Sequence, residues 1–328
     1  MDIYDTVILG AGPAGLFGAF YAGMRQMRAK IIEALPEPGG QLAVLYPEKM
    51  IYDVPGIPKI LAKDLVRDLV EQVDQWHPEI LLDERATGLT HLENGNWKVT
   101  TDKDEHYTRT VVICAGIGAF RPNRLPNDSI TLFENGGGVH YFVQDKMPFH
   151  RKNLLVVGGG DSAVDWALNL KDYAASVTLI HRREGFRAHE SSVTELMNSS
   201  VRVLTHYEVR VLEGDGHVER AVIFDNRTDE EMTIPVDAVL LNLGFKADIG
   251  AIKDWGLTFE KRYILVNNRQ ETNLPGVYAA GDVCKQADAD ALNLIATGFG
   301  QAAVAINHAY SFITGKSVFP GHSSEMRL

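Results

Sequence analysis

Two glycine-rich turns have a spacing that can bind dinucleotides. In the first, Gly10, Gly12 and Gly15 form G-x-G-x-x-G directly after the run 6–9 of β-branched residues and leucine, which predicts a buried strand. The first glycine makes a tight turn, the second lets the backbone approach a pyrophosphate, and the third allows a helix to pack closely on the strand. Pro13 and Ala14 then begin a helix whose free N–H groups favour phosphate. The alternative is a tight turn without a ligand, but residues 5–34 as a whole predict strand, turn, helix and strand.

The second turn repeats this pattern within residues 153–188. Gly158, Gly160 and Ala163 form G-x-G-x-x-A, and Asp161 and Ser162 stand at the predicted start of the helix. Two such turns in one chain indicate two nucleotide sites, and therefore electron transfer between two cofactors.

The residues that follow the second strand of each pattern differ in charge. Glu33 stands 18 residues after Gly15, where a carboxylate can accept hydrogen bonds from ribose hydroxyls. At the corresponding place in the second pattern stand His181, Arg182 and Arg183, with Arg187 nearby. A cationic cluster binds a 2′-phosphate that a carboxylate would repel. We therefore expect FAD at the first turn and NADP(H) at the second; the alternative for the cluster is a solvated group of charges.

Two further segments favour FAD. The segment PEPGGQL (36–42) places Gly40 and Gln41 where they can approach the ribityl or ring portion of the cofactor. The segment LPGVYAAGDV (274–283) predicts a strand that ends in a glycine turn, and Asp282 after this turn can accept hydrogen bonds from ribityl hydroxyls.

Composition excludes several other classes of protein. The 328 residues carry a net charge of −11, which argues against a nucleic-acid partner. The two cysteines, Cys114 and Cys284, are far apart in sequence and indicate a reducing compartment. The apolar run 7–24 follows Asp2 and Asp5 rather than basic residues, so it is not expected to be a signal peptide, and no other run predicts a membrane span. We expect a cytoplasmic protein with no metal site.

The chain resembles the thioredoxin-reductase-like flavoproteins from residue 5 onward, through the segments GAGPAG, PGGQL, GGGDSA, HRREGFRA and GVYAAGDV. The resemblance implies an α/β fold of two Rossmann-like, three-layer domains, and a homodimer. The FAD domain would comprise residues 1–115 and 246–328, and the NADPH domain, residues 117–244, would be inserted between its halves.

One feature of thioredoxin reductases is missing from this sequence. Their redox CxxC precedes the GGGDSA strand, but here residues 136–145 read GGGVHYFVQD. Without a dithiol relay, electrons must leave directly from the flavin, which can accept a hydride and release single electrons. Together with YPEKMIYDVPG (46–56) and the tail VFPGHSSEMRL (318–328), this resembles the thioredoxin-reductase-like ferredoxin–NADP reductases. The partner implied is ferredoxin or flavodoxin.

The same resemblance assigns roles to individual residues. Tyr52 and His322 would stack on the two faces of the isoalloxazine, and Ser323 would hydrogen-bond the flavin. The further FAD contacts that it implies are Tyr46, Ala86 and Phe120. Without the resemblance, Tyr46 and Phe120 could equally be packing residues, and His322 an exposed residue of a tail.

Two classes of function remain open from the sequence. The first is a reductase for ferredoxin or flavodoxin; the second is an NADPH-dependent disulfide or small-molecule reductase that acts without an internal CxxC. Ferredoxins and flavodoxins are acidic, so docking requires a locally basic surface. Residues 146–190 carry a net charge of +2, from the cations Lys146, Arg151, Lys152, Lys171, Arg182, Arg183 and Arg187 and five carboxylates. Some of these arginines are expected to bind NADPH instead.

Removal of the tail after Phe319 tests the role of His322. Stacking of an imidazole on the flavin contributes about 0.5–1.5 kcal/mol beyond the burial of the ring. This interaction is weak enough for the nicotinamide to displace the histidine. We expect the truncated protein to fold, with a changed flavin absorbance spectrum and a changed ratio of ferredoxin to oxygen as electron acceptor. An unchanged spectrum and unchanged kinetics would contradict the role given to this histidine.

Overall fold

The computed structural model describes residues 2–125, 128–134, 136–143 and 145–316. The chain divides into two compact units. Unit 1 comprises Met1–Val44, Met50–Ala119 and Ala247–Leu328, and unit 2 comprises Leu45–Lys49 and Phe120–Lys246. His322 and Ser323 lie outside the described residues, as does the side chain of Phe120. The sequence did not predict that Leu45–Lys49 belong to unit 2.

Unit 1 is built on a seven-stranded sheet with the strand order β5-β2-β1-β8-β7-β6, and β21 pairs with β8. Strands β1, β2, β5, β8 and β21 run parallel, whereas β6 and β7 are antiparallel to their neighbours. The bounds are β1 Ile3–Leu9, β2 Ala29–Ile32, β5 Glu79–Leu81, β6 Ala86–His91, β7 Trp97–Thr101, β8 Glu105–Ile113 and β21 Val277–Ala279. The carboxyl ends of β1, β2 and β8 therefore meet at one edge of the sheet.

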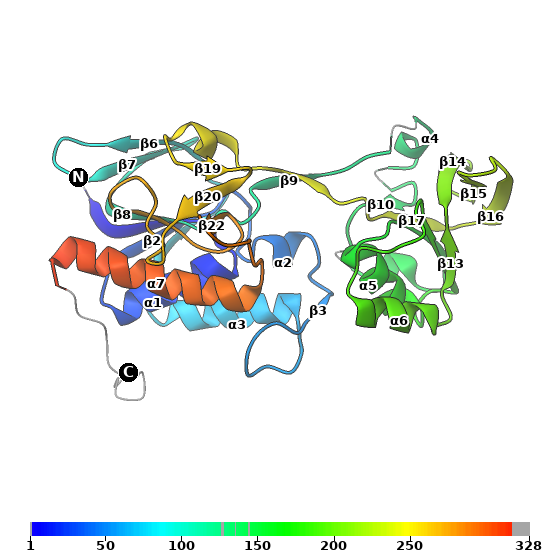
Figure 1. Cartoon of the computed structure of the whole chain (residues 1–328), viewed down its shortest axis with the longest axis horizontal. Helices are drawn as coiled ribbons and strands as arrows, with labels where there is room; N and C mark the ends of the chain where they lie inside the picture. The colour runs from blue at the N-terminus through cyan, green and yellow to red at the C-terminus, as the bar shows by residue number, and fades with distance from the viewer. Residues whose placement is uncertain (1, 126–127, 135, 144, 317–328) are drawn as a thin grey trace. The chain divides into compact units, whose positions relative to one another are not determined.

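Three long helices belong to this unit: α1 Pro13–Met24, α3 Ala62–Asp74 and α7 Ile295–Thr314. Helix α1 packs against both α3 and α7 (Figure 1). Helix α3 is amphipathic, because Leu65, Leu69 and Val73 recur at helical spacing and are buried. Helix α7 is capped at its C-terminus by Gly315, whose φ of 65° suits a residue without a side chain.

The remaining elements of unit 1 are short. The helical turns are α2 Gln41–Val44 and η2 Gly250–Asp254. Two small sheets pair β3 Met50–Ile51 with β4 Ile60–Leu61, and β19 Phe259–Glu260 with β20 Tyr263–Val266 and β22 Cys284–Gln286. Strands β9 Ala119–Pro122 and β18 Phe245–Asp248, where the chain passes between the units, pair with each other.

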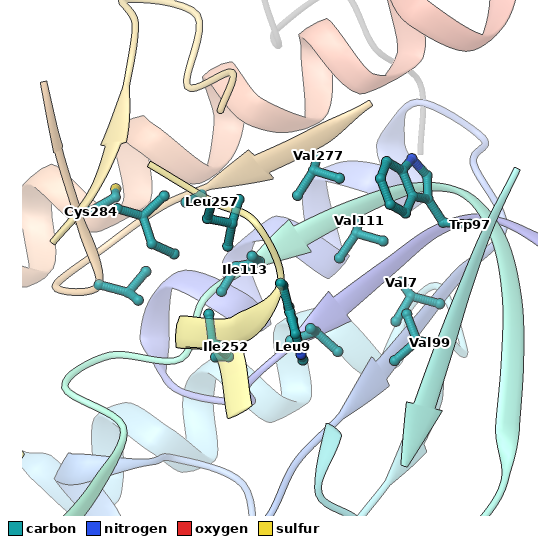
Figure 2. Close-up of a cluster of buried hydrophobic side chains, with 14 of the residues drawn as sticks. Val7, Leu9, Trp97, Val99, Val111, Ile113, Ile252, Leu257, Val277 and Cys284 are labelled. Atoms are coloured by element: carbon teal, nitrogen blue, oxygen red, sulfur yellow. The ribbon is translucent and has the colours of Figure 1, made fainter. Parts of the chain in front are cut away.

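One hydrophobic cluster joins the main sheet of unit 1 to the segments that follow β18. Figure 2 shows side chains of β1, β7, β8 and β21 converging with those of η2, of the segment after it and of β22: Val7, Leu9, Trp97, Val99, Val111, Ile113, Ile252, Leu257, Val277 and Cys284. The indole N–H of Trp97 donates to the carbonyl oxygen of Pro275 at 3.0 Å, which satisfies its polar atom. Each of these aliphatic side chains contributes about 1.5–3 kcal/mol by its removal from water, so the two sequence halves of unit 1 depend on each other.

Unit 2 contains a five-stranded parallel sheet with the order β10-β17-β11-β12-β13. The bounds are β10 Val139–His140, β11 Asn153–Val157, β12 Ser176–His181, β13 Arg202–Thr205 and β17 Ala238–Leu241. An antiparallel sheet is formed by β14 Tyr207–Glu213, β15 Arg220–Asp225 and β16 Glu231–Pro235. The helical elements are α4 Asp128–Thr131, η1 Met147–Phe149, α5 Asp161–Leu170 and α6 Glu190–Met197.

The central strands β11 and β17 of the parallel sheet are buried on both faces, because each face of this sheet is covered. Leu154 and Val156 of β11 join the cluster that includes α5 residues, whereas Leu155 and Val157 join the cluster of the antiparallel sheet. This alternation follows from the strand period of two. The result is three layers, with helices on one face of the parallel sheet and the antiparallel sheet on the other. In the part of the chain that the structure describes, no helix is both long enough and apolar enough to span a bilayer.

Candidate functional site: two nucleotide-binding edges

The first glycine turn connects β1 to α1 and leaves no room for side chains at two positions. Gly10 has a φ of +111°, and a Cβ there would lie 2.4 Å from the carbonyl oxygen of Cys114. A Cβ on Gly15 would lie 1.9 Å from the carbonyl oxygen of Gly10. Gly12 differs, since nothing lies within 4 Å of its Cβ position. The open space over Gly12, at the N-terminus of α1, is what a pyrophosphate requires.

Glu33 lies directly after β2, and its side chain is directed at this turn. The residue is 7% exposed. Its Oε2 accepts a hydrogen bond from the backbone N–H of Ala11 at 2.6 Å, and its Oε1 accepts one from the N–H of Leu35 at 2.9 Å. Burial raises the pKa of this carboxyl group, and the backbone donors oppose the increase. Each oxygen retains a lone pair, so the fixed carboxylate fits a ribose with two free hydroxyls.

Asp282 and Gln41 lie at the same edge although they are distant in sequence. The side-chain amide of Gln41 donates to Oδ2 of Asp282 at 3.3 Å. Burial raises the pKa of Asp282, and the hydrogen bond from Gln41 lowers it. A Cβ on Gly40 would lie 3.2 Å from the Cα of Gly12, so the Gly-Gly turn is in contact with the first glycine turn. The residues present thus fit the phosphates, ribose and ribityl chain of FAD.

The other residues predicted to contact FAD are placed differently. Ala86 begins β6 and pairs with Thr101. Tyr52 is 69% exposed, and the neighbouring Asp53 accepts a hydrogen bond from the N–H of Ile295 at the start of α7, at 2.8 Å. Tyr46 belongs to unit 2, where it packs against the cluster that contains α5 residues. The roles of these three residues stay predictions.

The second glycine turn connects β11 to α5 in unit 2 and has the same construction. A Cβ on Gly158 would lie 2.3 Å from the carbonyl oxygen of Asn242, whereas the Cβ position of Gly160 is open. Ala163 is fully buried, and Asp161 and Ser162 are exposed at the start of α5. Oδ1 of Asp161 accepts a hydrogen bond from the N–H of His189 at 3.0 Å, which links this turn to the start of α6.

Gly159, the middle residue of this turn, makes room for His181. A Cβ on Gly159 would lie 2.3 Å from two atoms of the imidazole ring. The ring also stacks on Phe186, with 5.3 Å between centroids, and its Nε2 is 3.2 Å from the carbonyl oxygen of Gly185. Burial lowers the pKa of His181, and the adjacent arginines lower it further. A neutral His181 therefore adds surface rather than charge to the site. The role of Gly159 was not predicted from the sequence. The run of three consecutive glycines at 158–160 was the signal that could have indicated it.

The three arginines after β12 remain exposed beside this turn. The backbone N–H of Arg187 donates to the carbonyl oxygen of Gly159 at 2.7 Å, so the segment 182–187 folds back onto the turn. Among the described residues, Arg182, Arg183 and Arg187 form no salt bridge. Free guanidinium groups next to a glycine turn can bind a 2′-phosphate in a fork geometry.

The two cysteines are poorly suited to redox chemistry. Both are buried. Burial raises the pKa of Cys284 to about 12, and it raises that of Cys114 further. The thiolate is the reactive form of cysteine, so both thiols are inert at neutral pH. Within the described ranges, no cluster of three or more His, Cys, Asp or Glu residues is placed to hold a metal ion.

Comparison with known proteins agrees with this arrangement. Residues 4–309 match the family model described as "Pyridine nucleotide-disulphide oxidoreductase". The chain is 54% identical to a ferredoxin–NADP reductase of Symbiobacterium thermophilum and 50% identical to one of Geobacillus thermodenitrificans, in each case over 99% of this chain and 98% of the relative. Its fold is similar to that of the thioredoxin reductase of Lactococcus lactis, with a TM-score of 0.80 and 28% identity over 95% of this chain and 100% of that one. The predicted α/β fold class is confirmed.

Replacement of Glu33 by Gln tests the FAD site. An amide offers one acceptor oxygen where the carboxylate offers two, so we expect FAD affinity to fall about ten- to a hundredfold, the effect of losing a hydrogen bond to a charged group. Equilibrium dialysis of the apoprotein with FAD measures this change. Glu37→Gln, an exposed neighbour, is the control. Equal affinities for the two variants would contradict the role of Glu33.

Replacement of both Arg182 and Arg183 by Ala tests the choice of nucleotide. Charged hydrogen bonds to a phosphate account for about ten- to a hundredfold in affinity each. We expect the KM for NADPH to rise by at least this factor and the KM for NADH to change little. Steady-state kinetics with ferricyanide as acceptor separates the two values. Equal losses for both nucleotides would show that the arginines do not read the 2′-phosphate.

Proposed function

Because the chain belongs to the pyridine nucleotide-disulphide oxidoreductase family, we propose that it is an FAD-dependent reductase that transfers electrons between NADP(H) and ferredoxin. The observation that carries this proposal is the pair of similar glycine turns that lead to opposite charges. Glu33 serves the first turn, and the arginines after β12 serve the second. A chain built this way holds two different nucleotides, one of them with a 2′-phosphate.

Residues of unit 1 would bind and orient FAD. The turn at Gly10–Gly15 would accept the pyrophosphate, Glu33 the adenosine ribose, and Asp282, held by Gln41, the ribityl chain. When bound, this cofactor supplies the ability to accept a hydride and to release single electrons. Tyr52 has an exposed ring, and its neighbour Asp53 is hydrogen-bonded to the start of α7. Tyr52 would cover one face of the flavin, with His322 on the other face and Ser323 beside it.

Residues of unit 2 would bind NADP(H). The open position at Gly160 and the N-terminus of α5 would accept the pyrophosphate. Arg182, Arg183 and Arg187 would bind the 2′-phosphate, while His181 and Phe186 provide a stacked surface beside it. The hydrogen bond between Asp161 and the N–H of His189 would keep the loop after the arginines close to the turn.

The properties of the thiols support a direct exit of electrons from the cofactor. Cys114 and Cys284 are buried and protonated, and segment 136–145 contains no cysteine. A one-electron carrier, ferredoxin or flavodoxin, is then the natural acceptor. We further propose a homodimer in the cytoplasm, on the basis of the family resemblance and of the sparse cysteines.

The similarity of the fold to thioredoxin reductases of known structure supports a second candidate, an NADPH-dependent disulfide or small-molecule reductase. The test is NADPH-driven reduction of purified ferredoxin and flavodoxin, in parallel with a disulfide substrate. We expect the one-electron carriers to be reduced and the disulfide to be left unchanged. Rapid reduction of the disulfide alone would favour the second candidate.

The double variant Cys114→Ser, Cys284→Ser tests whether a thiol takes part. Because both thiols are buried and protonated, we expect ferredoxin reduction within about twofold of the unmodified protein. The flavin absorbance and the melting temperature of the variant provide the control for folding. Loss of turnover in a variant that still folds and holds FAD would contradict a direct exit of electrons.

A further inference from the structure

A basic surface of unit 2 lies apart from the residues assigned to either nucleotide. It comprises residues 145–152, which precede β11 and include η1, and residues 171–173, which precede β12. We call it the amino-edge patch, because β11 and β12 are parallel and both begin there. The glycine turn and the arginines follow the carboxyl ends of the same strands. Since β11 has five residues, the two edges are roughly 15 Å apart.

The two segments of the patch hold each other in place. The backbone N–H of Arg151 donates to the carbonyl oxygen of Tyr173 at 3.1 Å. The hydroxyl of Tyr173 donates to Sδ of Met147 at 3.1 Å, and its ring lies 4.8 Å from that of His150. Phe149, at the centre of the turn, is 1% exposed and anchors it in the core of unit 2. The patch is therefore ordered before any partner arrives.

Positive charge is in excess on this patch. Among the described residues, Lys146, Arg151 and Lys152 form no salt bridge, whereas Lys171 is paired with Asp172. The other carboxylate, Asp145, accepts a hydrogen bond from the N–H of Met147 at 2.9 Å and so caps the turn. This local excess stands out in a chain whose net charge is −11.

An exposed apolar side chain lies among these cations. Met147 is 65% exposed, one of few large hydrophobic residues with such exposure in the described part of the chain. Methionine is enriched at the centres of protein interfaces, and its flexible thioether adapts to different partners. An exposed apolar side chain next to cations in the same segment is a composition found in small, transient docking surfaces.

We propose that the amino-edge patch is the docking surface for the acidic electron carrier. The proposal rests on the proposed function and adds to it the surface that the carrier uses. The arginines after β12 cannot bind both NADP(H) and the carrier, because a bound 2′-phosphate neutralises their charge. The cations of the amino-edge patch stay free while NADP(H) is bound, so they can attract the carrier over a distance and orient it. The order of the patch lowers the entropy cost of each encounter.

The triple variant Lys146→Glu, Arg151→Glu, Lys152→Glu tests this surface in the FAD-loaded, full-length enzyme. We expect the KM for ferredoxin at low ionic strength to rise at least tenfold, with a smaller change in kcat. The difference from the unmodified enzyme should shrink as salt is added, because salt screens exposed charges. NADPH oxidation with ferricyanide, a small acceptor that needs no protein docking, should remain unchanged.

A matched control separates local charge from total charge. Lys103, Lys261 and Arg269 are exposed cations of unit 1. Their replacement by Glu changes the net charge by the same amount, and we expect the KM for ferredoxin to change less than twofold. An equal rise of KM in both triple variants, or an unchanged KM in the patch variant, would overturn the docking proposal but leave the proposed function intact. Failure of the unmodified enzyme to reduce ferredoxin would overturn both.

Arg151 permits a second test that does not endanger the fold. Its φ of +55° lies in the left-handed region, which glycine adopts at lower cost. We therefore expect Arg151→Gly to keep or raise the melting temperature while raising the KM for ferredoxin severalfold. A purely structural role for Arg151 predicts the opposite, namely a lower melting temperature and an unchanged KM, and that result would contradict the proposal.

Discussion

A phosphate group can reach backbone N–H groups at a helix N-terminus only where no Cβ stands in its way. Both units of this chain are built around that constraint. At Gly10 and Gly158, a Cβ would lie within 2.4 Å of a carbonyl oxygen from a neighbouring segment, while the space over Gly12 and Gly160 is open. The parallel strands, the helices that follow them and the buried alternation of their side chains all serve to hold these two loops at the carboxyl edge of a sheet.

The two loops use the same backbone geometry, so the difference between them must come from side chains one strand further along. In unit 1 this side chain is a buried carboxylate held by two backbone donors. In unit 2 it is a neutral histidine followed by exposed guanidinium groups. A carboxylate tolerates burial here because backbone N–H groups offset its desolvation, whereas the guanidinium groups stay in water until a phosphate arrives. We infer that these charges select the nucleotide, while the shared backbone geometry provides the affinity for its pyrophosphate.

The parts of this arrangement that depend on local sequence could be predicted from the sequence. The glycine spacings, the position of Glu33 and the arginine cluster lie within single strand–turn–helix–strand segments, where chain geometry fixes their relation. Contacts between distant segments could not be predicted in this way. The pairing of Gln41 with Asp282, the clearance of Gly159 for His181 and the inclusion of Tyr46 in unit 2 depend on tertiary packing, which no local pattern encodes. The segment that contains His322 lies outside the described residues, so its role still rests on the resemblance.

The absence of a dithiol relay from the sequence has a consequence for the surface of the enzyme. A relay lets the protein choose its partner through thiol chemistry, since only a disulfide can react with it. Direct exit of electrons offers no such chemical selection, because any oxidant that approaches the cofactor can accept them. Selection must then come from how the partner binds.

In a chain with a net charge of −11, an acidic partner is repelled at long range by most of the surface and is attracted only where cations are in excess. Among the described residues, Lys146, Arg151 and Lys152 form no salt bridge, and they belong to the same patch as the exposed Met147. This patch meets the condition, and under the proposed assignment of the nucleotide sites it stays free while NADP(H) is bound. In the proposed function, the missing dithiol and the localised basic surface are therefore connected, because docking rather than thiol chemistry would select the partner.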